Sequence, residues 1–483
     1  MHAERATLSE LGLLPDATDH WPLAAWLDST RTRAGHDAIK RLIATPPVGL
    51  SGVQARQLLL PRLETIAANV PWRELQELGA QVSRFLSSNY EIVPAALVER
   101  TFFALRYRHI ASHVALQLRA VDALLRLGAE VAARLARLPA DNAFAVVASA
   151  FTVATNDPRT AQLRGAVERG RTLSLVALDA MVRSPQRLPG AHSAPATPFR
   201  AVVQDLVDAI GELDAYCALA TASAAVHGVI PQMVPRGALP LTLAGIRHPL
   251  LPHGVSNDVG LEAGERVLLL TGPNMAGKST LLRAVGIAVY CAHLGMAVAA
   301  EEAWIPLHDR LIVSITVRDN LQRGESLYLA EIRRVRKIVD AVERGESVLA
   351  IGDEVFRGTN IADATDATTL LVDGLSKAPH GTFVLSSHLA DVAASRRDHV
   401  GVACWCMEVD ASGAIPQFTF RVTRGVSDVR LGMLLLDSEG VGPILRRMAT
   451  DNHQSATEVV QPVRATGPAD EGAPELVRVR QDG

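Results

Sequence analysis

Hydrophobic positions along the chain follow two different patterns. From residue 21 to 235 apolar residues recur every three or four positions, as they do on the buried face of a helix. From residue 236 to 449 short continuous apolar runs alternate with helix-like segments, which is typical of strands buried on both faces of a parallel sheet. We therefore predict an all-α domain followed by an α/β domain.

Two apolar seams with a period of about 3.5 residues run through the predicted helical domain. The first extends from Val114 to Leu135 and ends before Pro139, and the second extends from Phe199 to Ala220. Two long antiparallel helices of this kind would form a lever, but an ordinary helical bundle fits the same periodicity. Residues 184–198, between the seams, form a loop rich in Pro, Ala and Ser.

The most apolar stretch, residues 268–300, raises the question of a membrane span. A membrane helix needs about 20 consecutive apolar residues, whereas Lys278, Arg283 and His293 interrupt this stretch. We therefore predict no span. We predict three elements instead: a buried strand at 267–271, a loop at 272–278 and a buried helix at 279–294.

Composition narrows the functional classes only slightly. The 48 Lys and Arg nearly balance the 51 Asp and Glu, so a nucleic-acid surface would have to be local. Four cysteines in 483 residues argue against a disulfide framework. We expect Cys404 and Cys406 to be strand cysteines, because a single Cys-x-Cys is a poor zinc site. Residues 1–19 carry acids and no apolar core like that of a signal peptide, so we expect a cytoplasmic protein.

The predicted loop satisfies the pattern G-x-x-x-x-G-K-[ST] through Gly272, Gly277, Lys278 and Ser279. In this pattern backbone N–H groups surround phosphate oxygens at the positive end of the following helix. Lys278 would reach the β and γ phosphates, and Ser279 would hold Mg²⁺. The predicted nucleotide-binding residues are Gly272, Pro273, Asn274, Met275, Ala276, Gly277, Lys278, Ser279 and Thr280.

A second apolar run, residues 347–352, ends in Asp353 and Glu354. An acid pair at the end of a strand is commonly only a solvated end, but a phosphate loop requires a carboxylate for its metal. Asp353 would coordinate Mg²⁺ through water, and Glu354 would orient and deprotonate the attacking water. A third strand, at 382–385, leads to His388, which could sense the γ-phosphate.

Taken together, these motifs resemble the ATPase domain of the MutS family. The matching segments, in the family's order and spacing, are 272–280, 295–300, 309–312, 324–331, 353–360 and 387–388. The resemblance covers about residues 21–448. It implies a P-loop NTPase domain of the ABC type that binds ATP and Mg²⁺ and hydrolyses ATP, preceded by a helical core or lever domain.

The same resemblance implies roles for two further residues. Ser326 would be presented across a dimer interface to the γ-phosphate bound by the partner, so each active site would need two chains. Phe420 falls where the family often places an aromatic residue or a histidine against the adenine ring, although an ordinary core position in a strand fits it equally well.

Several departures resemble shorter MutS-like ATPases rather than the mismatch-repair protein. Phe356 stands where the repair proteins usually have glycine, Gly352 where they have a bulky apolar residue, and Arg430 where they have serine. None of the ten phenylalanines is followed by the x-Glu of the family's mismatch wedge. We expect a short form without the mismatch-recognition and connector domains.

The expected domains are an N-terminal extension at 1–20, a helical domain at 21–235, an ATPase domain with a helical dimerisation end at 236–449, and a disordered tail at 450–483. Within the helical domain, about 139–198 would be a reduced version of the family's DNA clamp.

Two groups of basic residues could contact DNA. Arg333, Arg334, Arg336 and Lys337 share a predicted helix, where an interface or solvated face is favoured over DNA contact. Arg119, Arg126, Arg134 and Arg137 lie off the first apolar seam and could face phosphates. Such contacts would make affinity fall by about 0.9 log unit per log unit of salt for each phosphate neutralised.

We therefore predict a homodimeric, Mg²⁺-dependent ATPase that grips duplex, mismatched or branched DNA in repair or recombination, with no membrane partner and no other metal. In the alternative, the helical domain holds a protein or ribonucleoprotein partner. A transporter subunit is disfavoured, because residues 324–326 do not supply a Leu-Ser-Gly-Gly-Gln signature.

Overall fold

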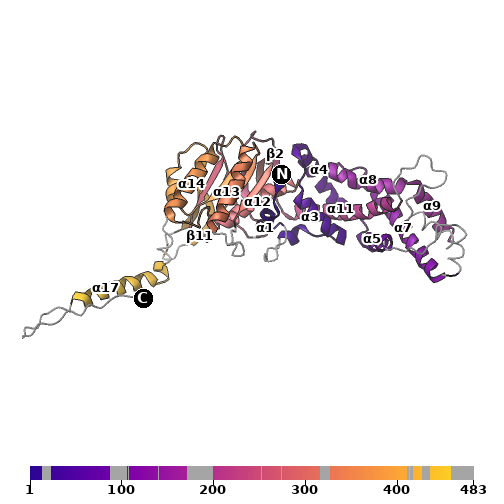
Figure 1. Cartoon of the computed structure of the whole chain (residues 1–483), viewed down its shortest axis with the longest axis horizontal. Helices are drawn as coiled ribbons and strands as arrows, with labels where there is room; N and C mark the ends of the chain where they lie inside the picture. The colour runs from indigo at the N-terminus through magenta and orange to yellow at the C-terminus, as the bar shows by residue number, and fades with distance from the viewer. Residues whose placement is uncertain are drawn as a thin grey trace, which may run out of the picture. The chain divides into compact units, whose positions relative to one another are not determined.

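The computed structural model describes residues 1–13, 23–87, 106, 108–139, 141–170, 199–251, 253–273, 275–315, 327–410, 413, 417–426 and 436–457. The chain divides into two compact units. The first comprises Met1–Val409 and Phe418–Val429, and the second Asp410–Gln417 and Arg430–Gly483. The helical half and residues 236–409 and 418–429 of the α/β half belong to the first unit (Figure 1).

Every element described between residues 23 and 225 is a helix. These are α2 (Leu23–Leu27), α3 (Arg33–Ala44), α4 (Gly49–Ala67), α5 (Trp72–Ser87), α7 (Arg108–Leu135), α8 (Asn142–Asn156), α9 (Pro158–Glu168) and α11 (Phe199–Ala225). The two seams lie on α7 and α11, as predicted. These helices do not form a separate pair, since α7 packs against α5, α8 and α9 while α11 packs against α3, α4, α5 and α8. The arrangement is a bundle.

The segment that we expected to form a reduced clamp contributes two helices to this bundle. Asp141 begins α8 by accepting the N–H of Phe144 (2.7 Å), and Asp157 begins α9 by accepting the N–H of Arg159 (2.8 Å). Both helices pack on α7, and α8 also packs on α11. Residues 141–168 therefore form part of the bundle, and residues 171–198 of the expected clamp region lie outside the described residues.

The α/β half is built on a seven-stranded sheet. Its strands, in spatial order, are β1 (His2–Ala3), β7 (Arg310–Ser314), β8 (Val348–Gly352), β9 (Thr382–Ser386), β5 (Val267–Thr271), β10 (Val402–Asp410) and β11 (Gln417–Arg424). The neighbouring pairs from β1 to β10 are parallel. The predicted strands at 267–271, 347–352 and 382–385 are confirmed as β5, β8 and β9.

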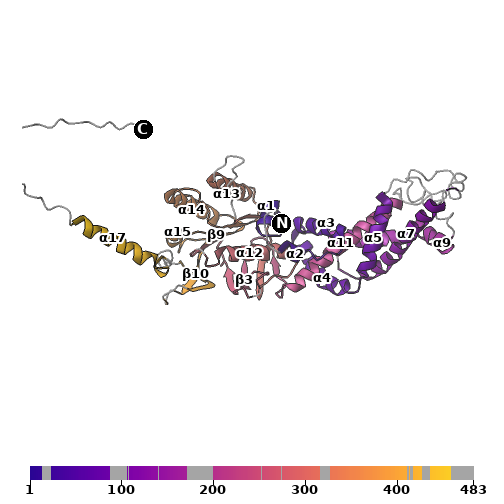
Figure 2. The same ribbon diagram turned by 90° about the horizontal axis from the view of Figure 1, so that it is seen from below.

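Helices cover both faces of this sheet (Figure 2). They are α12 (Lys278–His293), α13 (Leu327–Glu343), α14 (Ile361–Ser376) and α15 (Ala390–Ser395). Alternate residues of β5 serve different faces: Leu268 and Leu270 belong to the core formed with α12, whereas Val267 and Leu269 belong to the core formed with α13, α14 and α15. Burial on both faces explains why these strands are continuously apolar.

A second, four-stranded sheet completes the α/β half. Its order is β2 (Gln232–Val234), β6 (Glu302–Pro306), β3 (Thr242–Ile246) and β4 (Asn257–Gly260). β2 contacts α4 of the helical bundle. Cys404 is buried and Cys406 half-buried in β10, in agreement with the expected strand cysteines.

Residues 1–13 of the expected N-terminal extension pack against the α/β half. β1 pairs with β7 at the edge of the large sheet, and α1 (Arg5–Glu10) packs on β7. Glu10 accepts the N–H of Ile315 (2.8 Å) and forms an ion pair with Arg334, and Glu4 forms one with Lys337 (2.7 Å). Two of the four basic residues on α13 therefore lie at an internal interface. A strand of two residues is too short to give a periodic signal.

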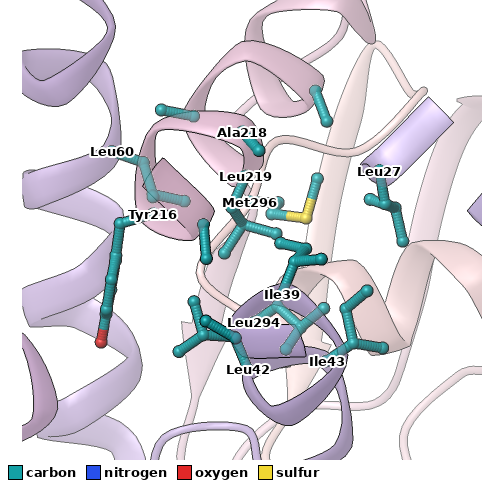
Figure 3. Close-up of a cluster of buried hydrophobic side chains, with 14 of the residues drawn as sticks. Leu27, Ile39, Leu42, Ile43, Leu60, Tyr216, Ala218, Leu219, Leu294 and Met296 are labelled. Atoms are coloured by element: carbon teal, nitrogen blue, oxygen red, sulfur yellow. The ribbon is translucent and has the colours of Figure 1, made fainter. Parts of the chain in front are cut away.

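One apolar core joins the two halves of the first unit. Figure 3 shows Leu294 and Met296, which follow α12, among side chains of the helical bundle. The bundle residues labelled there are Leu27, Ile39, Leu42, Ile43, Leu60, Tyr216, Ala218 and Leu219. Tyr290 of α12 donates its hydroxyl to the carbonyl of Ile43 (2.6 Å). The end of α12 is thus embedded in the bundle.

A buried polar network lies beside this core. Arg56 of α4 donates to Asp141 (2.7 Å) and to the hydroxyl of Tyr216 on α11 (3.1 Å). Gly295 has φ +80°, and a Cβ there would lie 2.8 Å from the Cβ of Arg56. The chain leaving α12 therefore touches the residue that connects α4, α8 and α11.

The second unit contains α17 (Val441–Thr457), in which Arg446 forms an ion pair with Asp437 (2.7 Å), a residue just before the helix. Among the residues described in both units, none of the helices is long and apolar enough to cross a membrane.

Replacing Arg56 by leucine should destabilise the protein by about 3 kcal/mol, because it leaves Asp141 buried without its cation. The free energy of unfolding in urea measures this. Arg62→Leu, on the exposed side of the same helix, is the control and should change it by less than about 0.5 kcal/mol. Equal stability of the two variants would contradict the structural role of Arg56.

Candidate nucleotide-binding site

The predicted phosphate loop lies between β5 and α12. Gly272 and Gly277 have φ of 135° and 98°, a region that side chains rarely adopt. A Cβ on Gly272 would also lie 2.9 Å from the Cβ of Met407, so both backbone angle and space require glycine there. Asn274, in the same loop, lies outside the described residues. The glycines bring the chain round to the N-terminus of α12, where a helix favours anions.

Lys278 is the first residue of α12, and its side chain is only 4% exposed. Its ammonium donates to the carbonyls of Gly272 (2.7 Å) and Pro273 (3.0 Å) and lies 3.9 Å from a carboxylate oxygen of Glu354. Burial lowers the pKa of Lys278, while the neighbouring acids oppose that shift. Neutral carbonyls hold the ammonium of Lys278 within the loop. Negatively charged phosphate oxygens would be stronger hydrogen-bond partners for this ammonium than the carbonyls are.

The two residues predicted to hold Mg²⁺ are in direct contact. The hydroxyl of Ser279 donates to Oδ2 of Asp353, and the N–H of Asp353 donates to the carbonyl of Ser314 (2.8 Å). The other oxygen, Oδ1, accepts the hydroxyl of Ser386. A hydroxyl beside a carboxylate is an oxygen donor set of the kind that Mg²⁺ prefers, so these residues fit the metal.

Strand order explains the position of Ser386. β9 lies between β5 and β8, so its last residue stands between the phosphate loop and the acids. Its Oγ also accepts the N–H of Glu354 (3.0 Å). The sequence places a serine after an apolar run but does not give the order of strands, so this contact was missed.

Glu354 lies between two cations, because Lys278 is 3.9 Å from one carboxylate oxygen and Arg357 is 3.9 Å from the other. Its backbone has φ +51°, which is uncommon for a residue with a side chain. The left-handed conformation is part of a tight turn that follows β8.

Two departures from the family pattern have local explanations in this turn. Phe356 has φ +66°, so glycine would be the unstrained choice there. Its buried ring packs edge-on against Tyr328 of α13, with centroids 6.0 Å apart, and this contact offsets the strain. A Cβ on Gly352 would lie 2.7 Å from Val355, which leaves no room for a larger residue.

Glu331 of α13 holds the same turn from the other side. Its buried carboxylate accepts the N–H of Gly358 (3.4 Å) and lies 3.9 Å from Arg357. Burial raises the pKa of Glu331. The turn that carries Glu354 is therefore tied to α13. Ser326, immediately before this helix, lies outside the described residues.

A cavity of about 590 Å³ opens beside the loop and is lined by Lys278, Ser279 and Thr280 at one end. Met407 and Phe420 also line it. Phe420 is 45% exposed with φ +56°, and Asn257 fixes its strand by donating to the carbonyl of Phe420 (3.0 Å) and accepting the N–H of Val422 (2.7 Å). Phe420 therefore lies at the cavity and not in the core, and its contact with adenine stays a prediction.

His248 also lines this cavity, although we assigned it no role from the sequence. Burial, assisted by the nearby Arg283, lowers the pKa of His248 to about 4, so its ring is neutral at neutral pH. His388 is exposed on the loop after β9 and is not among the lining residues, so its role as a γ-phosphate sensor stays a prediction.

Comparison with known proteins agrees with this geometry. Residues 268–454 match the model of MutS domain V. The chain is 28% identical over 254 residues to the DNA mismatch repair protein MutS of Halalkalibacterium halodurans. The aligned region covers 51% of this chain and 29% of that protein. The chain is 33% identical over 239 residues to MutS of Symbiobacterium thermophilum, covering 48% and 27%.

Over residues 268–454 the chain is similar to domain V of the MutS family. The matched region, domain V, is the family's P-loop ATPase domain, and the loop at 272–280 lies within it. The aligned part spans less than a third of the length of these MutS relatives. Their activity as whole proteins is therefore a separate question from the chemistry of the shared domain.

Lys278→Ala should weaken ATP binding about 10- to 100-fold, since a charge-assisted hydrogen bond is worth about 1.5–3 kcal/mol. Titration with a fluorescent ATP analogue measures the dissociation constant. Lys377→Ala removes an exposed ammonium at the end of α14 and should bind like the wild type. Wild-type affinity of Lys278→Ala would show that the loop does not hold the phosphates.

Proposed function

We propose that this chain is a Mg²⁺-dependent ATPase of the MutS family whose hydrolysis works a dimeric clamp on DNA. The observation that carries the enzymatic part is the convergence of Lys278, Ser279, Asp353 and Glu354 from two strand ends. The phosphate chain would lie along the loop at the start of α12. Mg²⁺ between Ser279 and Asp353 would neutralise charge on the phosphate oxygens.

In this proposal Glu354 orients the attacking water and takes its proton. Glu354 directly follows Asp353, and its carboxylate lies 3.9 Å from Lys278, which would contact the γ-phosphate. Arg357, at the same distance from the other oxygen, limits the rotation of the side chain. A carboxylate held by two cations near the γ-phosphate would accept a proton from the attacking water and would not bind the phosphate itself.

Dimerisation follows from the predicted role of Ser326, which we propose acts on the partner's γ-phosphate. Support comes from α13, which begins at the next residue and is tied to the turn of Glu354 through Tyr328 and Glu331. A contact that pulls on the start of α13 would therefore also move the turn of the base. This links the closing of two chains to hydrolysis in each.

DNA is the proposed partner because the relatives carry the name DNA mismatch repair protein. Within the bundle, Arg126 pairs with Asp122 and Glu168, and Arg134 donates to the carbonyl of Asn69. Arg119 and Arg137 are exposed. Phosphate contacts by the group of Arg119, Arg126, Arg134 and Arg137 would therefore rest mainly on Arg119 and Arg137.

A protein or ribonucleoprotein partner is the second candidate. Helix α8 contains no charged residue, and its exposed face presents Val146 (68% exposed) and Val153 (54%). An uncharged apolar face on a bundle suits protein contact better than contact with a phosphate backbone.

Glu354→Gln should keep ATP affinity and lose hydrolysis by about 100-fold or more, because the amide cannot accept the water's proton. Phosphate release and nucleotide binding are measured on the same preparation. Glu343→Gln, exposed at the end of α13, is the matched control. Normal turnover by Glu354→Gln would remove this residue from the proposed mechanism.

DNA coupling is tested by the steady-state ATPase rate with no nucleic acid, with homoduplex, with a single mismatch and with a four-way junction, each at two salt concentrations. We expect at least one DNA to change the rate, and the effect to shrink as salt rises. Arg119→Ala with Arg137→Ala should weaken the response. If all rates coincide while the enzyme hydrolyses ATP, DNA is not the partner and the second candidate is favoured.

A further inference from the structure

Ser386 contacts both acids of the site with a single side chain. It is the last residue of β9 and is 1% exposed. Its hydroxyl donates to Oδ1 of Asp353, and its oxygen accepts the N–H of Glu354 (3.0 Å). A hydroxyl has one hydrogen to donate, so this arrangement fixes the direction of both bonds.

The first bond determines how Asp353 presents its carboxylate. With Oδ1 occupied by Ser386, Oδ2 is the oxygen directed at Ser279. Ser279 donates its hydrogen to Oδ2, which leaves the lone pairs of its own oxygen available to a metal. Without Ser386 the carboxylate of Asp353 could rotate about χ2, a torsion with a broad range in aspartate. Oδ2 of Asp353 and Oγ of Ser279 would then lose their relative orientation.

The second bond acts on the backbone of Glu354. A left-handed residue with a side chain costs about 1–3 kcal/mol and persists only where neighbouring contacts hold it. The N–H of Glu354 is directed into the protein, where Ser386 accepts it. The same hydroxyl therefore helps to hold the backbone conformation from which the carboxylate of Glu354 extends between Lys278 and Arg357.

We propose that Ser386 is a positioning residue of the ATPase site, which couples the orientation of the metal acid Asp353 to that of the base Glu354. Ser386 is not among the residues that line the cavity, so it acts through these two residues. The proposal rests on the proposed function, because it assigns Ser386 a role in metal binding and hydrolysis at that site.

Loss of the Ser386 hydroxyl should affect Mg²⁺ binding and not the binding of nucleotide alone. Removing the hydroxyl should leave the loop around Lys278 intact, so nucleotide should bind as before when Mg²⁺ is absent. Mg²⁺ should then add less affinity than it does in the wild type. Residues that orient a metal ligand commonly contribute about 10- to 100-fold to metal affinity or activity.

The test compares Ser386→Ala with the wild type by titrating a fluorescent ADP analogue with and without Mg²⁺, and by measuring kcat against Mg²⁺ concentration. We expect unchanged affinity without Mg²⁺, a half-saturating Mg²⁺ concentration raised about tenfold, and kcat lowered about tenfold. Ser386→Thr keeps the hydroxyl and should restore both quantities.

Ser376→Ala is the matched control. Ser376 is also a buried serine, but its hydroxyl donates to the carbonyl of Asp373 in α14. It should change neither the Mg²⁺ dependence nor kcat. If Ser386→Ala does not fold, as judged by its melting temperature, Ser386→Cys is measured instead, because a thiol is of similar size and is a weak donor.

A folded Ser386→Ala with the Mg²⁺ dependence and kcat of the wild type would overturn the positioning role alone. Failure of the wild type to bind nucleotide in a Mg²⁺-dependent way, or to hydrolyse ATP, would instead overturn the proposed function on which that role rests. A Ser386→Ala that lost affinity equally with and without Mg²⁺ would also contradict the proposal, since it would indicate a general structural effect.

Discussion

Helix α12 is buried along almost its whole length. One end lies at the nucleotide site and the other lies in the helical bundle. The first residue of α12 is Lys278 of the phosphate loop, and the chain that leaves its last turn packs Leu294 and Met296 into the helical bundle. A buried helix can shift only if its neighbours rearrange, because the core around it is close-packed. The nucleotide site and the bundle are therefore mechanically connected through α12. Two of the contacts through which such a shift would reach the bundle are Tyr290 with Ile43 and Gly295 with Arg56.

In the turn that follows β8, contacts from two neighbouring elements offset backbone strain. Glu354 and Phe356 both have positive φ, which the chain would not adopt by itself. Ser386 holds the turn from β9, while Tyr328 and Glu331 hold it from α13. The turn thus depends on a strand from its own sheet and on a helix whose start would face a partner chain. Such double support can keep a catalytic base in place and still let a neighbouring helix influence it.

The sequence predicted most of the site because the phosphate loop and the acids are local signals. A glycine pattern between a strand and a helix requires only neighbouring residues, and in the structure Lys278 contacts the loop while Ser279 contacts Asp353. Contacts that depend on strand order could not be predicted in the same way. Ser386 lies beside Asp353 only because β9 lies between β5 and β8.

For the fold as well, the sequence predicted single elements but not which elements are neighbours. The long seams on α7 and α11 gave the correct helices, but periodicity does not say which helices are neighbours, and α8 packs against both. The sequence also did not reveal that residues 1–13 join the large sheet, since a two-residue strand is defined by its partner β7 and not by its own sequence.

Connection of the nucleotide site to the bundle through α12 is the central claim of this account. Hydrogen–deuterium exchange of the Glu354→Gln variant, with and without saturating ATP and Mg²⁺, tests it most directly. The account predicts changed exchange not only in the phosphate loop but also in α4 around Arg56 and at the start of α8. Changes confined to the residues around the cavity, with α4 and α8 unaltered at full nucleotide occupancy, would contradict it.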